Sequence, residues 1–345
     1  MKASKYLGIV GVLLFAAIII YFDPQKILAS ILKTNLLLFS LGVLALLPLL
    51  FLKAWKAQLL LRPVKGKISL ARSAEIWAIG FFFGLMSPGK VGDFLRAVYL
   101  NRDAECAEGK GKKKKGGAHA GGSGSSSSRV SKGLCLSAVF VERLLDMATL
   151  FLMAFAGLMA FSVAFNAGNA VIVTLLAGFV AFVIAIFVIS RKKFMAKIAR
   201  PFFGFLVPER FKETFRESFH DFYEGMKSFA REKRTTLFVA LLTIITWLAA
   251  IGQYYIIALA VHINVSYFFL VMVLPAAFLM ESLPISFSGL GTREAVLIFF
   301  MSFAGIAAQQ AISFSLGVLA TNIVLGFLGL ALFNARQAKG NEMLA

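Results

Sequence analysis

Six runs of apolar residues, each about as long as a bilayer is thick, constrain what this chain can fold into. They occupy residues 6–22, 36–52, 134–163, 171–190, 236–261 and 310–333. A helix of about 20 apolar residues crosses the hydrocarbon core of a membrane, where only helices and closed barrels satisfy their own backbone. Hydrophobic residues make up 59% of the sequence. We therefore predict an all-α polytopic membrane protein with six spanning helices.

Two further apolar segments, residues 75–100 and 268–301, are interrupted by a similar motif. The first copy runs from Ser87 to Arg96 and the second from Ser286 to Glu294. Helix breaks at corresponding places in two halves of a membrane protein are typical of transport sites. We predict that the chain reverses at these breaks, which contain Pro88, Gly89, Gly92, Pro284, Gly289 and Gly291.

The distribution of basic residues indicates that these two segments are re-entrant hairpins. If each returns to the side it came from, 30 of the 36 Lys and Arg residues lie in cytoplasmic segments, residues 53–74 among them. Only Lys26 and Lys33 then lie outside, as the positive-inside rule requires. The hairpins enter from opposite faces, which resembles an inverted repeat. We expect a multi-pass protein of the plasma (inner) membrane with both termini cytoplasmic, and the charge of +19 does not indicate a nucleic-acid partner.

Two cytoplasmic segments differ from the rest of the single transmembrane domain that we assign to residues 1–345. Residues 107–133 are a basic, Gly/Ser-rich stretch of low complexity, which predicts a disordered loop. Residues 209–234 carry phenylalanines at helical spacing with charged residues between them, which predicts an amphipathic helix. We expect this helix to lie along the inner leaflet, with packing on the transmembrane bundle as the alternative.

Nine ionisable residues fall at membrane depth, where a charge is costly and needs a partner or a function. They are the basic residues Lys90, Arg96, Arg143 and Arg293 and the acids Asp93, Glu142, Asp146, Glu281 and Glu294. One interpretation is mutual neutralisation that holds the bundle together. The other is a polar cavity that receives a lipid headgroup, in which the basic residues bind phosphate. The acids would then set the charge of the cavity or contact a cationic part of the headgroup.

The placement of two arginines favours the headgroup cavity. Asp93 and Thr292 each follow a glycine and are suited to cap a helix, which places Arg96 and Arg293 in its first turn. The helix dipole disfavours a cation there unless an anion binds at the same end. Both arginines are therefore predicted to act on one phosphate. Pairing with Asp93 and Glu294 remains the alternative.

No catalytic or metal-binding set is evident in the sequence. Ser87, Ser286 and Ser288 have no histidine nearby, and the three histidines lack the spacing of metal ligands. The glycines at 89 and 92 are not followed by the Lys-Ser/Thr ending of a P-loop. We expect neither an enzyme nor a cofactor, and homo-oligomerisation is left open.

Three segments together resemble the transmembrane family of lysylphosphatidylglycerol synthases, also called flippase-like membrane proteins. They are Phe83–Asp93, Val141–Asp146 and Leu283–Glu294, and the resemblance extends over residues 5–335. It implies a protein that binds a phosphate-bearing lipid, aminoacylated or glycosylated, and moves it between leaflets. The chain ends at Ala345, soon after the last span, so the stand-alone form without a synthase domain is expected. The alternative is a non-transporting partner that presents a lipid-linked intermediate to a glycosyltransferase or lipid-modifying enzyme.

Overall fold

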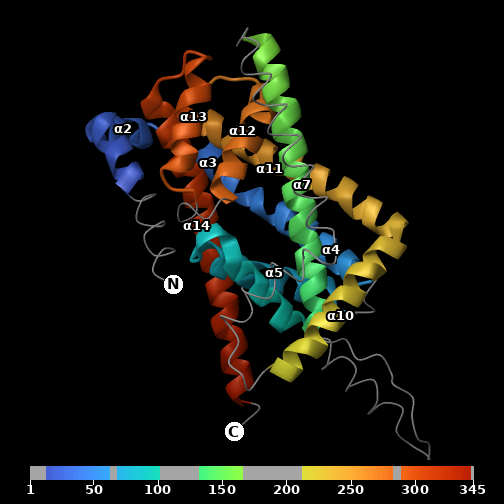
Figure 1. Cartoon of the computed structure of the whole chain (residues 1–345). Coiled ribbons are helices and arrows are strands. Elements are labelled where there is room, and N and C mark those ends of the chain that lie inside the picture. The colour runs from blue at the N-terminus through green and yellow to red at the C-terminus, as the bar shows by residue number, and fades with distance from the viewer. Residues whose placement is uncertain (1–12, 63–67, 102–131, 166–211, 283–288, 343–345) are drawn as a thin grey trace, which may run out of the picture.

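The computed structural model describes residues 13–62, 68–101, 132–165, 212–282 and 289–342, which contain helices and turns and no strand (Figure 1). The elements are α2 (Pro24–Leu32), α3 (Leu36–Leu44), α4 (Leu46–Leu61), α5 (Leu70–Leu85), the 3₁₀ helix η1 (Pro88–Leu95), α7 (Lys132–Ala164), α10 (Lys212–Arg231), α11 (Lys233–Ala260), α12 (Tyr267–Ser282), α13 (Thr292–Ser302) and α14 (Ala308–Glu342). The all-α prediction is confirmed for these residues.

Four of the six predicted spans are helices long and apolar enough to cross a membrane. They are Leu36–Leu61, Gly133–Ala164, Lys233–Ala260 and Ala308–Ala338. In the described part of the first predicted span, a helix at Leu13–Tyr21 meets α2 at an angle of 85°. The predicted span at 171–190 lies outside the described residues, so the total of six stays a prediction.

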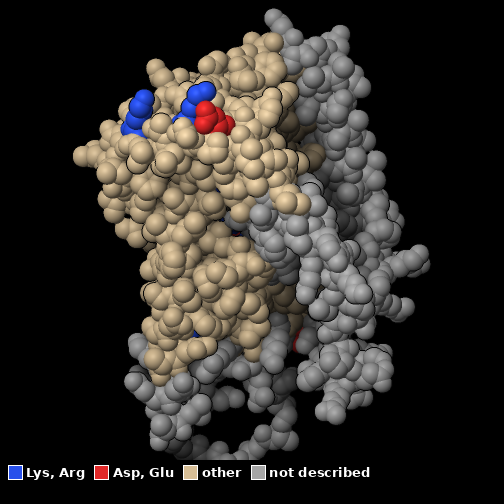
Figure 2. Space-filling view, turned by 90° about the vertical axis from the view of Figure 1, so that its left-hand side faces the viewer, with Lys and Arg blue, Asp and Glu red and all other residues tan. Residues whose placement is uncertain are grey.

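Large apolar side chains on the surface are consistent with a lipid environment. Ile20, Leu32, Leu36 and Leu37 are among those most exposed. On the face that includes α2, Figure 2 shows charged side chains gathered at one end and uncharged ones over most of the described area. Water-soluble monomers rarely expose large contiguous apolar patches, whereas membrane proteins must do so.

Two apolar cores follow one another along α7, the green helix in Figure 1. Residues of its first part, from Cys135 to Val141, pack with α4, α5 and α11. Residues of its later part, from Leu150 to Phe161, pack with α11, α12, α13 and α14. The charged residues Glu142, Arg143 and Asp146 lie between these two stretches, so α7 carries them into a layer between the two cores.

The first broken segment turns back against α5. Gly92 lies so close to the carbonyl of Phe83 that a Cβ atom would collide with it, and Gly80 lies equally close to the Arg96 side chain. The chain beyond the break therefore runs antiparallel to α5. Our prediction that Asp93 caps a helix is wrong, because Asp93 lies inside η1 and α-helical conformation begins only at Arg96.

The second broken segment also folds back, with α13 packed beside α12. The cap predicted at Thr292 is wrong, because Gly291 is the N-cap and Thr292 is the first helical residue. Gly291 has a φ of 83°, a conformation that glycine adopts without strain. Glu294 accepts a hydrogen bond from the backbone N–H of Gly291 at 2.6 Å. Pro284 lies outside the described residues, and re-entrance into a membrane stays a prediction for both hairpins.

The helix predicted at 209–234 is divided in the structure between α10 and the start of α11. The second half of α10 packs on α7: the ring of Phe222 meets Phe140, and Gly225 lies against Ser137. Phe229 is buried in the core that α4 and α5 share. These contacts favour the alternative of packing on the bundle, while a position along the inner leaflet stays a prediction. The predicted loop at 107–133 lies almost entirely outside the described residues.

Candidate functional site

Six charged side chains from α4, the first hairpin and α7 form one buried cluster. They are Lys56, Asp93, Arg96, Glu142, Arg143 and Asp146. The ammonium of Lys56 lies 2.6 Å from Asp146 Oδ1 and 3.7 Å from Glu142 Oε1. Arg96 contacts the other oxygen of Glu142 at 3.1 Å. Three cations thus oppose three acids, so these six side chains are neutral together.

Two arginines of this cluster keep hydrogen-bond donors without a partner. Arg143 pairs with Asp93 through its NH2 group, but its buried Nε has no acceptor in the described structure. Arg96 donates from Nε to the carbonyl of Asp93 at 3.1 Å, and its NH2 group lacks an acceptor there. An unsatisfied buried donor costs about 1–3 kcal/mol, more when it is charged, so a ligand acceptor at either position is favoured.

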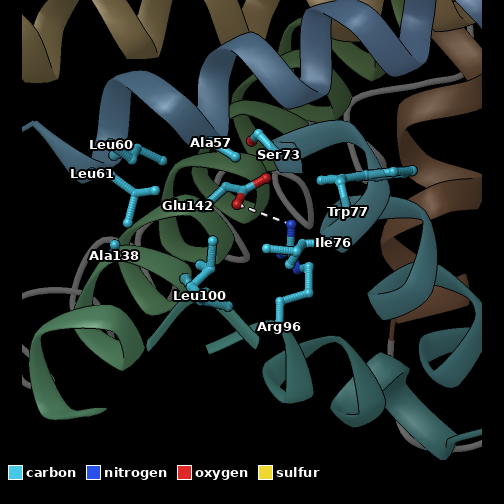
Figure 3. Close-up of a pocket in the computed structure, with 11 residues that line it drawn as sticks. Ala57, Leu60, Leu61, Ser73, Ile76, Trp77, Arg96, Leu100, Ala138 and Glu142 are labelled. Carbon is cyan, nitrogen blue, oxygen red and sulfur yellow. Dashed lines mark hydrogen bonds and ion pairs between the residues drawn. The ribbon is translucent and has the colours of Figure 1, made fainter. Parts of the chain in front are cut away.

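The surroundings of the two free donors differ. Figure 3 shows Arg96 reaching toward Glu142 in a small pocket whose other walls are mostly apolar side chains, including Leu60, Ile76 and Leu100. Arg143 instead borders a larger opening and retains 21% exposure of its side chain. Arg143 is therefore the arginine of the cluster that a headgroup can reach.

A second cluster surrounds Arg293 at the start of α13. Its guanidinium contacts Glu281 at 3.5 Å and Glu294 at 3.1 Å. Its Nε donates to the hydroxyl of Ser315 at 2.7 Å, and its NH2 group donates to the Ser315 carbonyl at 3.2 Å. Every nitrogen of Arg293 thus faces a protein acceptor, and its side chain is 1% exposed.

The structure separates residues that the sequence analysis placed on one phosphate. Arg96 and Arg143 belong to the first cluster, and Arg293 belongs to the second with Glu281 and Glu294. The contacts of Arg293 favour the alternative in which it pairs with acids. The remaining candidate, Lys90, lies in η1, but its side chain is outside the described part of the structure.

Two adjoining cavities open beside the clusters. The first has an empty volume of about 500 Å³, opening included, and Lys56, Asp93, Glu142, Arg143 and Asp146 line it. The second has about 560 Å³, opening included, and Glu281 borders it. The cavities share a wall made of Lys53, Trp77, Phe81, Trp247 and Ala250. The described residues contain no group of His, Cys, Asp and Glu that could hold a metal ion.

Lys53 and Lys56 were missed because the sequence analysis placed residues 53–74 in a cytoplasmic loop. That boundary is wrong, because α4 continues to Leu61 and carries both lysines into the bundle. Lys56 is 2% exposed, and the ammonium of Lys53 lies 4.5 Å from the centre of the Trp77 ring. The sequence did indicate that this helix continues, because no proline or glycine interrupts it between Phe51 and Leu61.

A comparison against models of protein families gave a match over nearly the whole chain. The model for the lysylphosphatidylglycerol synthase TM region matches residues 8–329. The chain belongs to this family. Membership makes it a membrane protein related to lipid modification or flipping. No curated protein and no solved structure matched the chain.

Proposed function

We propose that this member of the lysylphosphatidylglycerol synthase TM family binds a lipid with a phosphate-bearing headgroup and moves it between leaflets. The observation that carries the proposal is Arg143, which borders the first cavity with a buried Nε that has no acceptor in the described structure. A guanidinium that borders an opening and is not fully satisfied by protein acceptors is well suited to bind a phosphate oxygen.

The charge of the first cavity supports an anionic ligand. The three cations and three acids that line this cavity balance one another, and Arg96, which pairs with Glu142 from outside the cavity, gives the seven residues together a net charge of +1. The ion pairs hold Lys56 and Arg143 in place before a ligand arrives, which reduces the entropy lost on binding. We infer that phosphate meets Lys53 and Arg143, while the aromatic wall excludes water around it.

The proposed role is binding and movement without covalent chemistry, and it needs no cofactor. The alternative role, presenting a lipid-linked intermediate to a glycosyltransferase or lipid-modifying enzyme, would use the same cavity. The two roles differ in whether the protein alone moves lipid.

Mass spectrometry of lipids that co-purify with the protein tests the binding step. We expect phosphate-bearing lipids enriched over their share of the membrane, and less enrichment in a variant that combines Arg143→Met with Asp93→Asn. Arg231→Met, at an exposed position at the end of α10, is the matched control. Equal enrichment in all three proteins would contradict a phosphate site at Arg143.

A further inference from the structure

Three polar side chains that border the second cavity have hydrogen-bonding groups without a partner among the described residues. Gln253 is 3% exposed and donates from Nε2 to the carbonyl of Gly42 at 3.1 Å, which leaves its Oε1 without a donor. The hydroxyl of Tyr254 and the carboxamide of Asn322, a residue that is 9% exposed, make no hydrogen bond within the described structure. Because buried polar groups in native proteins are nearly always hydrogen-bonded, these three indicate that a polar group occupies the cavity.

The charges around this cavity favour an uncharged occupant. Among the described residues that line it, Lys53 and Glu281 are the charged ones, so the lining as a whole has no net charge. Glu281 also contacts the guanidinium of Arg293. An ion in a buried cavity needs an opposite charge, whereas a neutral polar group needs only hydrogen bonds. The amide and hydroxyl groups without partners both donate and accept, which suits a ligand with several hydroxyls.

Aromatic rings form a large part of the remaining lining. Trp77 and Phe81 of α5 are stacked, with ring centroids 5.3 Å apart. Trp247 and Tyr254 of α11 lie 5.6 Å and 5.1 Å from the ring of Phe278, between centroids. The C–H groups of a cyclic polyol pack on such apolar faces, while its hydroxyls point outward to polar side chains. An aromatic lining with a few fixed polar groups therefore fits a ring that carries hydroxyls.

We propose that the second cavity binds an uncharged cyclic polyol, such as an inositol or a hexose, joined to the phosphate of the lipid headgroup. This inference rests on the proposed function, in which the phosphate lies at Arg143 in the first cavity. Five lining residues are common to the two cavities, so a ring joined to that phosphate lies beside the second. Gln253 accepts a hydrogen bond from one hydroxyl of the ring, and Asn322 and Tyr254 bind others.

Two short-chain lipids of equal charge test the inference with the purified full-length protein, in a detergent that contains no sugar. Dioctanoyl phosphatidylinositol carries a cyclic polyol, whereas dioctanoyl phosphatidylmethanol carries a methyl group on the same phosphodiester. We expect the wild-type protein to bind the first about 10-fold more tightly or better, because a site that hydrogen-bonds hydroxyls rejects an analogue without them.

A variant that combines Asn322→Leu with Tyr254→Phe should lose this preference and bind the two lipids within about 3-fold of each other. Neither replacement removes a hydrogen bond between described residues, so the fold should be retained. Tyr255→Phe is the matched control, because Tyr255 is the next residue on α11 and lines neither cavity. This control should keep the full preference.

The other outcomes decide against the inference. Equal affinities in the wild-type protein would overturn it, and so would a preference that survives in the double variant. Free inositol that binds as tightly as phosphatidylinositol would overturn the assignment to a lipid headgroup. If the double variant does not fold, Tyr254→Phe alone takes its place, and an undiminished preference in it overturns the inference. Failure of the proposed function looks different, because the wild-type protein would then bind neither lipid.

Discussion

Replacing Arg293 with alanine should lower the free energy of unfolding by about 3–5 kcal/mol, because it leaves two buried carboxylates without their cation. Glu281 and Glu294 are both almost fully buried beside Arg293. Denaturant unfolding of the purified protein in detergent measures the change. Combining Arg293→Ala with Glu294→Ala should recover part of the loss, because one of the unpaired charges is then removed.

Arg231→Ala is the matched control for this prediction, because Arg231 is exposed on α10 and should change stability little. An Arg293→Ala variant with wild-type stability that no longer binds lipid would contradict our interpretation. That result would instead support the prediction from the sequence, in which Arg293 binds phosphate from the first turn of α13.

Replacing Arg143 with methionine and Asp93 with asparagine together should slow lipid movement by about 10- to 150-fold. This range corresponds to about 1.5–3 kcal/mol for one lost charge-assisted contact to phosphate. Both replacements are needed because Asp93 is 2% exposed and would otherwise remain as an unpaired buried acid. The double variant removes the pair without leaving either charge, so the fold should be retained.

A surface pair offers a matched control for this double variant. Lys227 and Glu224 on α10 lie 2.6 Å apart, and both side chains are more than 40% exposed. Combining Lys227→Met with Glu224→Gln removes an ion pair that lines neither cavity, and movement should be unchanged. If both double variants move lipid at the wild-type rate, Arg143 does not bind the headgroup.

The fold class and four spans could be predicted because hydropathy over about 20 residues depends little on tertiary contacts. The reversals between α5 and the helical residues from Arg96, and between α12 and α13, could be predicted for a similar reason, since glycine and proline act on the local backbone. The capping residues could not be assigned. Asp93 turns away from the helix start to meet Arg143, a residue of α7 that lies far from it in the sequence.

The ionisable residues of the site could be identified from the sequence, but their pairing could not. Glu142 and Asp146 could be identified because they lie inside a long apolar run. Lys56 was missed because we ended the second predicted span at the first charged residue, although α4 continues beyond it. The spacing of apolar residues in α10 shows that one face of the helix is apolar. It does not show whether this face contacts lipid or packs on α7. Both the pairing of the buried charges and the surface on which α10 packs depend on contacts between residues far apart in the sequence, which a local pattern does not reveal.

The central claim is that this protein alone moves a phosphate-bearing lipid between leaflets. The most direct test reconstitutes the purified protein into vesicles containing a fluorescent phosphatidylglycerol and adds an impermeant reagent that destroys the outer-leaflet label. We predict that inner-leaflet label is also lost from vesicles that contain the protein, and not from protein-free vesicles. If the inner-leaflet label stays protected in both, the protein does not translocate this lipid by itself, and the claim is contradicted.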